Sequence, residues 1–303
     1  MQRRNFIKNT SLGAAALSFG SLDMLDSKKK PTILSLQLYS VRDAIRKDPV
    51  GVIDALSKIG YKDGEHAGYN AEKRQFYGYS PLDWKKILSD HGMTMKSGHT
   101  VFGPNHYDMA TKTVTDLWKT IVEDAVLAGQ EFIISPSLNA NLRKNGDDLK
   151  KFLEGFNVSG NYCKSKGIRF GYHNHDFEFN TKLDDKVLMD IIMDHTDPAV
   201  VAHQIDIGNM YGGGGLAMDY LKKYKGRYEL MHVKDEIKTP GSTPDHWESC
   251  ILGKGIIGTK DVIKYARKTS GTFYLIIEQE SYQGKAPIDT IKEDYDIMKK
   301  WGY

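Results

Sequence analysis

Strand-like apolar segments alternate with amphipathic, helix-like segments eight times between residues 31 and 303. Residues 32–40 are strand-like and precede residues 49–60, where apolar side chains recur at helical spacing; residues 131–137 precede 147–167 in the same way. Strands that alternate with helices form a parallel sheet covered by helices. Eight such units in about 270 residues match a closed barrel. We therefore predict an α/β fold, a single-domain (β/α)8 TIM barrel over residues 31–303.

The alternative is an open, doubly wound sheet. Such a sheet commonly carries a G-x-G-x-x-G turn after its first strand, and no such turn follows residues 32–40. The same periodicity predicts a strand over residues 168–174 and helices over 112–129 and 185–195. No segment indicates a second domain, and the closed barrel remains the favoured architecture.

The first 27 residues have a different character. Arg3 and Arg4 precede a short, glycine- and alanine-rich apolar run from Leu12 to Leu22. A basic region followed by such a run is typical of an export signal and is too short to span a membrane. The paired arginines resemble the twin-arginine consensus; an amphipathic or disordered N-terminus is the alternative. We predict a signal peptide and linker over residues 1–27, no membrane span and a periplasmic location.

Charge and cysteine content exclude several classes of function. The net charge is +3, from 42 basic and 39 acidic residues, and the basic residues form no block. A nucleic-acid or membrane-surface partner is therefore not expected. Cys163 and Cys250 are the two cysteines and lie far apart in sequence, so no Cys-x-x-Cys zinc or redox motif exists.

Titratable residues gather where the predicted strands end. In a TIM barrel the active site forms at the carboxyl ends of the strands. The last four strands each contribute one candidate ligand there: His173, Asp206, His232 and Glu278. Imidazole and carboxylate groups together suit a divalent ion such as Mn²⁺, Zn²⁺ or Co²⁺. Each residue alone has a structural explanation, such as Asp206 capping the next helix, but four on consecutive strands favour a metal site.

Several motifs carry a family resemblance. They are YHNHDFEF (172–179), DIGN (206–209), HVKD (232–235), LGKGIIG (252–258) and IIEQE (276–280), with LQLYSVRD (36–43) at the first strand. Together they resemble the sugar phosphate isomerase/epimerase family of xylose-isomerase-like TIM barrels, over residues 32–300. The resemblance implies one divalent metal ion (Mn²⁺, Zn²⁺, Co²⁺ or Mg²⁺) held at His173, Asp206, His232 and Glu278. His173 stands where family members often carry glutamate, and this difference puts a two-carboxylate proton shuttle in doubt. The histidine-rich fifth strand resembles the inosose dehydratase branch of the family.

The remaining candidates are assigned to chemistry or to substrate contact. We predict Glu278, His173 and Lys234 as catalytic residues, with Lys234 as a partner for a substrate oxygen. We predict contacts to a sugar from five residues near strand ends: Tyr39, Glu65, His99, His175 and Asn209. Capped loops, surface ion pairs and a solvated lysine are the alternative explanations for these positions.

These features predict a metal-dependent enzyme that acts by enolisation next to the carbonyl of a small sugar or keto-sugar. Reprotonation would give isomerisation or epimerisation, and loss of a β-substituent would give elimination from a ketosugar or 3-keto-glycoside. An endonuclease-IV-like hydrolase and a non-catalytic sugar-binding barrel are the alternatives. The oligomeric state is left open, with a homo-oligomer as one alternative.

Overall fold

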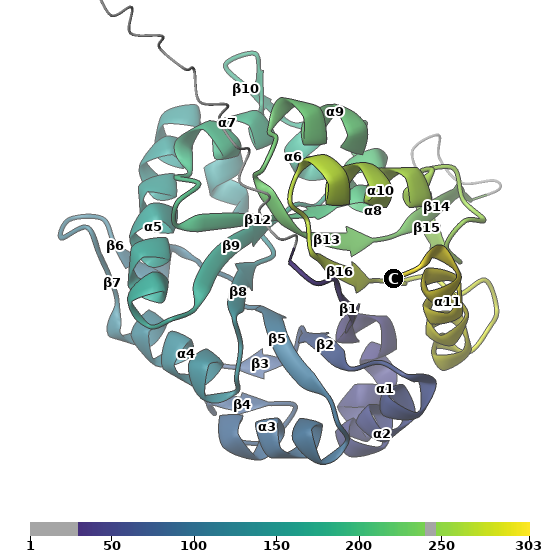
Figure 1. Ribbon diagram of the computed structural model, residues 1–303. Helices are drawn as coiled ribbons and strands as arrows, with labels where there is room; N and C mark the ends of the chain where they lie inside the picture. The colour runs from purple at the N-terminus through teal and green to yellow at the C-terminus, as the bar shows by residue number, and fades with distance from the viewer. Residues whose placement is uncertain (1–29, 240–246) are drawn as a thin grey trace, which may run out of the picture.

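The structure, a computed structural model, describes residues 30–239 and 247–303 and shows eight parallel strands closed into a barrel (Figure 1). The strand order around the barrel is β1-β16-β13-β12-β9-β8-β5-β2. The strands are β1 (Ile33–Gln37), β2 (Asp63–His66), β5 (Thr94–His99), β8 (Phe132–Ser135), β9 (Arg169–His173), β12 (Val201–Asp206), β13 (Tyr228–Val233) and β16 (Tyr274–Ile277). The predicted single-domain TIM barrel is confirmed. The signal peptide expected over residues 1–27 lies outside the described residues.

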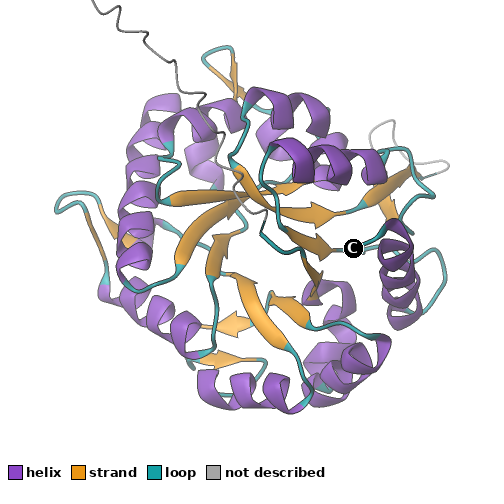
Figure 2. Ribbon diagram, in the orientation of Figure 1, coloured by secondary structure: helices purple, strands orange, loops and turns teal. Residues whose placement is uncertain are grey.

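Helices surround the barrel on its outer face (Figure 2). They are α1 (Arg42–Lys47), α2 (Pro49–Ile59), α3 (Pro81–Asp90), α4 (Asp116–Leu127), α5 (Gly146–Ser165), α6 (Phe177–Asn180), α7 (Leu188–His195), α8 (Ile207–Gly212), α9 (Ala217–Lys223), α10 (Thr259–Thr269) and α11 (Pro287–Trp301). Proline occupies the first helical turn of α2, α3 and α11, where its missing N–H costs no helical hydrogen bond. Among the described residues, no helix has both the length and the apolar character needed to cross a membrane.

The loops between strands and helices contain short hairpins and 3₁₀ turns. They are the hairpins β3–β4 (Tyr69–Asn70, Gln75–Phe76), β6–β7 (Tyr107–Asp108, Thr113–Val114), β10–β11 (Lys182–Leu183, Lys186–Val187) and β14–β15 (Asp235–Lys238, Trp247–Cys250), and the 3₁₀ turns η1 (Leu38–Val41), η2 (Pro104–His106) and η3 (Ala140–Arg143). Two of the hairpins occupy residues that the sequence assigned to the first turns of helices. The helix predicted from residue 112 begins at Asp116, and the helix predicted from 185 begins at Leu188. Lys112 and Asp185 adopt positive φ angles of 53° and 62°, which suit a hairpin turn and exclude a helix.

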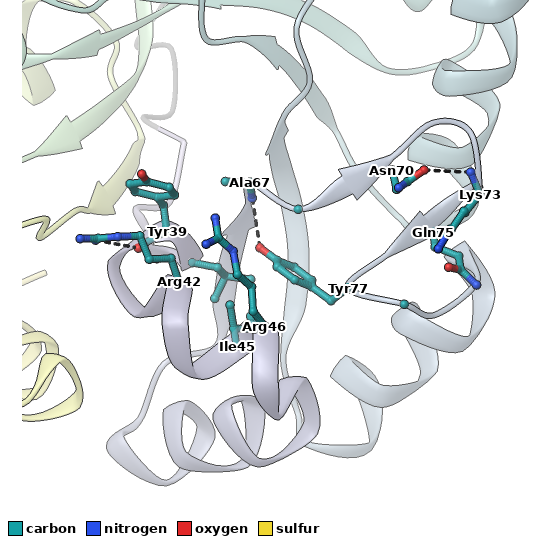
Figure 3. Close-up of a pocket in the computed structure, with 12 residues that line it drawn as sticks. Tyr39, Arg42, Ile45, Arg46, Ala67, Asn70, Lys73, Gln75 and Tyr77 are labelled. Carbon is teal, nitrogen blue, oxygen red and sulfur yellow. Dashed lines mark hydrogen bonds between the residues drawn. The ribbon is translucent and has the colours of Figure 1, made fainter.

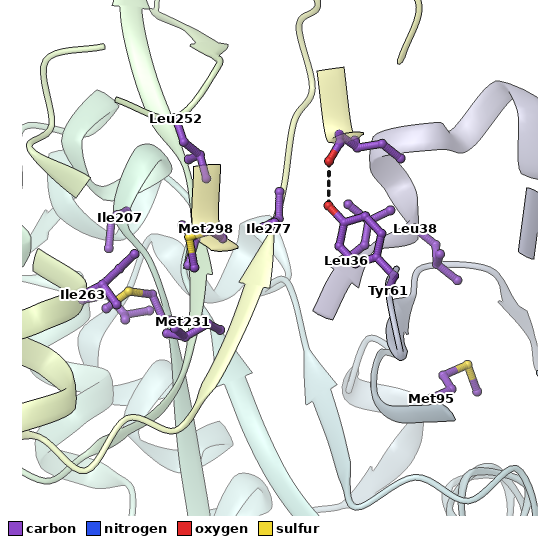
Figure 4. Close-up of a cluster of buried hydrophobic side chains, with 14 of the residues drawn as sticks. Leu36, Leu38, Tyr61, Met95, Ile207, Met231, Leu252, Ile263, Ile277 and Met298 are labelled. Atoms are coloured by element: carbon purple, nitrogen blue, oxygen red, sulfur yellow. Dashed lines mark hydrogen bonds between the residues drawn. The ribbon is translucent and has the colours of Figure 1, made fainter. Parts of the chain in front are cut away.

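The apolar core lies mainly between the strands and the helices. Met231 of β13 and Ile277 of β16 are fully buried there and belong to one cluster with Met298 of α11 (Figure 4). In the same cluster the hydroxyl of Tyr61 donates a 2.8 Å hydrogen bond to the carbonyl of Ile291. This bond joins the segment just before β2 to α11. Alternate residues of these strands point into the barrel. The outward-facing residues of β13 and β16 are therefore apolar and pack toward the helices.

Candidate functional site

The inner face of the barrel carries both apolar and polar side chains. Ile134, Leu230 and Ile276 form a buried apolar cluster inside the barrel, while Asp63 near the amino end of β2 is buried in hydrogen bonds with Ser35 and Thr94. Two residues further along their strands, His232 follows Leu230 and Glu278 follows Ile276 on the same face. Pairing between neighbouring strands sets Asp206 beside His232. The period of two and this register together gather the polar residues at the carboxyl end of the barrel.

Three of the predicted metal ligands form one compact cluster. Asp206, His232 and Glu278 each offer an atom, and these atoms lie within 4.8 Å of one another. His232 Nδ1 is 2.9 Å from Glu278 Oε2 and 3.7 Å from Asp206 Oδ2. All three side chains are buried. An imidazole and two carboxylates in this arrangement match the donors of a divalent metal site.

The two oxygens of the Asp206 carboxylate have different roles, because one caps a helix and the other faces the cluster. Its Oδ1 accepts hydrogen bonds from the backbone N–H groups of Gly208 (2.9 Å) and Asn209 (2.8 Å), which caps α8. Its Oδ2 is fully buried, and the ammonium of Lys234 lies 3.3 Å from it as an ion-pair partner. A buried carboxylate oxygen needs such a positive partner. Oδ2 also lies 3.7 Å from His232 Nδ1, so it is the oxygen of Asp206 that a bound cation would contact.

His173 lies close to this cluster but belongs to a second group. Its Nε2 is 3.9 Å from Asp206 Oδ2, and it forms a triad of imidazoles with His99 and His232. Burial lowers the pKa of His173 well below its ordinary value, and the neighbouring imidazoles of His232 and His99 lower it further. His173 is therefore a neutral imidazole in the folded protein.

Gln204, which the sequence analysis missed, orients these imidazoles. Its Nε2 donates to Glu65 Oε2 at 2.8 Å, and its Oε1 lies 2.9 Å from His173 Nδ1 and 2.7 Å from His99 Nε2. Because the carboxylate only accepts, the amide oxygen faces the two rings and accepts from both. His173 then carries its proton on Nδ1 and directs the Nε2 lone pair toward Asp206. The sequence could have indicated Gln204, because it precedes Asp206 by two residues and therefore lies on the same face of the strand.

Glu65 connects this amide to the cluster of Asp206, His232 and Glu278. It is fully buried, and its Oε1 lies 2.6 Å from His232 Nε2 and 2.9 Å from the donating Gln37 Nε2. Ser97 donates to its Oε2 at 2.5 Å. Burial alone would raise the pKa of Glu65, but the imidazoles of His99 and His232 and these hydrogen bonds lower it to about 2. The ionised Glu65 accepts from His232 Nε2. Burial alone would lower the pKa of His232, but the carboxylates of Glu278 and Glu65 raise it well above its ordinary value, so the ring also carries a proton on Nδ1, which faces Glu278. A metal ion held at Nδ1 would replace that proton, with Glu65 keeping the ring in its orientation.

Lys234 compensates the negative charge of the cluster. Its Nζ lies 3.0 Å from Glu278 Oε2 and 3.3 Å from Asp206 Oδ2, and it also pairs with Glu280. Burial alone would lower the pKa of Lys234, but the three carboxylates raise it well above its ordinary value. The ammonium therefore remains charged although the side chain is fully buried.

A cavity of about 740 Å³ opens above the cluster at the mouth of the barrel. Six of the predicted site residues line it: Tyr39, His99, His173, His175, Asn209 and Glu278. Four others do not line it and lie fully buried: Glu65, Asp206, His232 and Lys234. This placement corrects two expectations, because Glu65 and Lys234 are enclosed by protein groups and do not contact the space available to a sugar.

Glu178, a residue without a role in the predicted site, fixes the loop that carries His175. Its Oε2 accepts from the backbone N–H of His175 at 2.8 Å, and its Oε1 is bonded to the hydroxyl of Tyr172. The side chain is fully buried, and burial raises the pKa of Glu178 to about 8. The folded protein thus holds a proton there that the unfolded chain releases near pH 4.5.

We expect Glu178 to make the protein less stable as pH rises from about 4.5 to 8, because the folded state binds the extra proton in that window. Glu178→Gln mimics the protonated form and removes this dependence. Between pH 6 and pH 8, wild type should lose about 2 kcal/mol more unfolding free energy than the variant. Urea unfolding at both pH values measures the difference. The exposed Glu123→Gln serves as the control, and equal pH slopes in wild type and Glu178→Gln would contradict the assignment.

Comparisons with known proteins agree with this architecture. The family model described as "Xylose isomerase-like TIM barrel" matches residues 53–301. A sugar phosphate isomerase/epimerase from Parabacteroides distasonis superposes with a TM-score of 0.74 at 24% identity, covering 92% of this chain and 98% of its own. A probable 3-DHS dehydratase from Bacillus anthracis gives a TM-score of 0.64 at 12% identity, covering 88% of this chain and 98% of its own. At these identities the likeness shows the fold.

Curated relatives match over shorter stretches. An inosose dehydratase from Clostridium perfringens is 32% identical over 101 residues, which is 33% of each chain. Inosose dehydratase 1 from Bacillus cereus is 25% identical over 145 residues, 44% of this chain and 48% of the relative. The chain thus aligns with about a third to a half of the length of these relatives. The family match covers most of the barrel, and the chain belongs to the xylose isomerase-like TIM barrel family.

Proposed function

We propose that this protein is a divalent-metal-dependent enzyme that removes a proton next to the carbonyl of a ketosugar and then eliminates a β-substituent. The observation that carries the proposal is the buried cluster of Asp206, His232 and Glu278 beneath a cavity large enough for a sugar. The names of the relatives, inosose dehydratase and 3-DHS dehydratase, support a dehydration of this kind.

The donor set fits a metal ion. Asp206 Oδ2, His232 Nδ1 and a Glu278 oxygen would hold it, and Glu65 presents the correct nitrogen of His232. A bound divalent ion polarises a substrate carbonyl and so lowers the cost of the negative charge that forms when the α-proton leaves. Lys234 keeps Glu278 and Glu280 in place on the cavity side of the cluster.

His173 is the proposed proton acceptor. Its ring is neutral, its Nδ1–H is held by Gln204, and its Nε2 lone pair is directed into the site that the cavity reaches. The C–H electron pair is first held in the enolate next to the carbonyl, from which the α-carbon can take up a proton again. The same pair then forms the new C=C bond as the bond to the β-oxygen breaks. The protonated His173 returns the proton to the departing oxygen. A single base on one side of the substrate suffices for elimination, whereas epimerisation needs a second acid on the opposite face.

The test is exchange of the α-proton. Wild type incubated with metal and a keto-glucoside in D₂O should incorporate deuterium α to the carbonyl and release the aglycone, both followed by NMR. His173→Gln should retain about one metal ion per chain and lose at least about a hundredfold in exchange rate, since general bases contribute this much. Loss of the metal in His173→Gln would identify His173 as a ligand instead.

Two further outcomes would overturn the proposal. Fast epimerisation of free ketohexoses without elimination would favour the isomerase alternative. A bound metal with no exchange on any keto-sugar would favour the hydrolase or the non-catalytic sugar-binding alternative. We also propose export, on the paired arginines Arg3 and Arg4, which favours an unphosphorylated substrate and which cell fractionation of the full chain tests.

A further inference from the structure

A second pocket adjoins the cavity at the mouth of the barrel. It has a volume of about 300 Å³ and lies between α1 and the β3–β4 hairpin (Figure 3). Tyr39 and Ala67 line both this pocket and the larger cavity, so the two spaces are neighbours that share a wall. The floor includes Leu38 and Ile45, which are buried. A ligand longer than one sugar ring could therefore extend from the cavity across Tyr39 into this pocket.

The two spaces differ in the charged groups that line them. Carboxylates of Asp176, Glu278 and Glu280 line the larger cavity together with the guanidinium of Arg143. The second pocket is lined by Arg42, Arg46 and Lys73 and by no carboxylate. Charges of one sign lining a recess attract ligand groups of the opposite sign. The second pocket is thus suited to a negatively charged group.

The three cations differ in how far the protein already uses them. Arg42 donates to the hydroxyl of Tyr282 at 2.7 Å, and its guanidinium lies 4.9 Å from the centre of the Tyr39 ring, which holds that ring at the shared wall. Arg46 and Lys73 form no side-chain hydrogen bond or ion pair with another described residue. Figure 3 shows Arg46 rising from α1 toward Ala67 and Tyr77. The Tyr77 hydroxyl is occupied by the backbone N–H of Ala67 at 3.1 Å, so these cations remain available to a ligand.

We propose that this pocket binds the leaving unit of the substrate and that this unit carries a carboxylate. The inference rests on the proposed function, because an elimination yields two fragments, and each needs a place beside the site where the bond breaks. An isomerase acting on a free monosaccharide would leave the second pocket without an occupant. Tyr39 offers its ring as a platform between the two fragments, with 37% of its surface exposed.

The probes are para-carboxyphenyl and para-carbamoylphenyl β-D-glucoside, which differ by one charge and cannot be eliminated because they carry no ketone. Calorimetric titration at low salt should show the carboxylate binding about fivefold more tightly, the effect expected of two partly exposed ion pairs. The preference should vanish at about 0.5 M salt. The double variant Arg46→Gln/Lys73→Gln should lose the preference at low salt.

The matched control is Lys47→Gln/Lys62→Gln, which removes the same charge from exposed lysines that do not line the pocket. It should keep the fivefold preference. Equal affinities for the two probes in wild type, or equal loss of preference in both double variants, would overturn the proposal. Exchange on an uncharged keto-glucoside is measured separately. Exchange without charge preference rejects only this pocket assignment. Charge preference without exchange rejects the proposed reaction, and with it the leaving unit as the occupant, and leaves the pocket as a carboxylate-binding site.

Discussion

Asp206→Asn is expected to abolish metal binding while the barrel stays folded. The substitution keeps an oxygen at Oδ1, which accepts from Gly208 and Asn209 and caps α8. It replaces Oδ2, the buried oxygen that lies 3.3 Å from Lys234 Nζ, by an amide nitrogen that cannot bind a cation. Loss of a residue that only supports a metal ligand weakens metal binding by up to about a hundredfold. Loss of a ligand itself should therefore lower metal affinity by at least about a hundredfold, and exchange of the α-proton should fall with it.

Elemental analysis after dialysis measures the metal, and urea unfolding checks the fold. Asp197→Asn is the control, because Asp197 also accepts a backbone N–H, that of Ala199 at 2.8 Å, but lies before β12 and away from the cluster. It should bind metal as wild type does. Asp206→Ala should lose the metal and, in addition, about 1 kcal/mol of stability through the lost cap. Full metal occupancy in a folded Asp206→Asn would exclude Asp206 as a ligand.

Glu65→Gln is expected to weaken metal binding although Glu65 contacts neither the cavity nor the metal position. Its two carboxylate oxygens accept from four donors, those of Gln37, Ser97, Gln204 and His232. A glutamine keeps one of these oxygens and replaces the other by an amide nitrogen. That nitrogen then faces two donors and cannot accept from them. His232 is then no longer held with its proton on Nε2. Metal affinity should fall about 10- to 100-fold, and unfolding free energy should fall by about 2 to 4 kcal/mol.

Competition with a chromophoric chelator measures the affinity, and urea unfolding measures the stability. Asp63→Asn separates the two effects, because Asp63 lies two residues earlier on β2 and is buried in its own network with Ser35 and Thr94. That variant should lose stability and keep its metal affinity. If Asp63→Asn weakens the metal as strongly as Glu65→Gln, the effect comes from general loosening of the barrel.

The fold, and the gathering of His173, Asp206, His232 and Glu278 at the carboxyl end of the barrel, could be predicted because they depend on patterns that are local in sequence. Strand–helix alternation defines the barrel, and a titratable residue after an apolar run marks the end of a strand. The depth of a side chain is different, because it depends on the register between strands. Glu65 lies beside Gln37 and Ser97 on the neighbouring strands, deeper in the barrel than the cavity. The sequence of one strand does not show how deep in the barrel its residues lie. The full burial of Lys234 likewise depends on three carboxylates contributed by two separate segments, the end of β12 and the residues after β16.

The ammonium of Lys234 also bears on the order in which the protein matures. Small zinc domains remain unfolded until the metal arrives, because metal binding supplies the free energy that folds them. Here the chain supplies its own cation against Asp206, Glu278 and Glu280. The barrel can therefore close around a neutralised site in a cell that is short of metal. Loading then becomes a step that follows folding, in whichever compartment offers the ion.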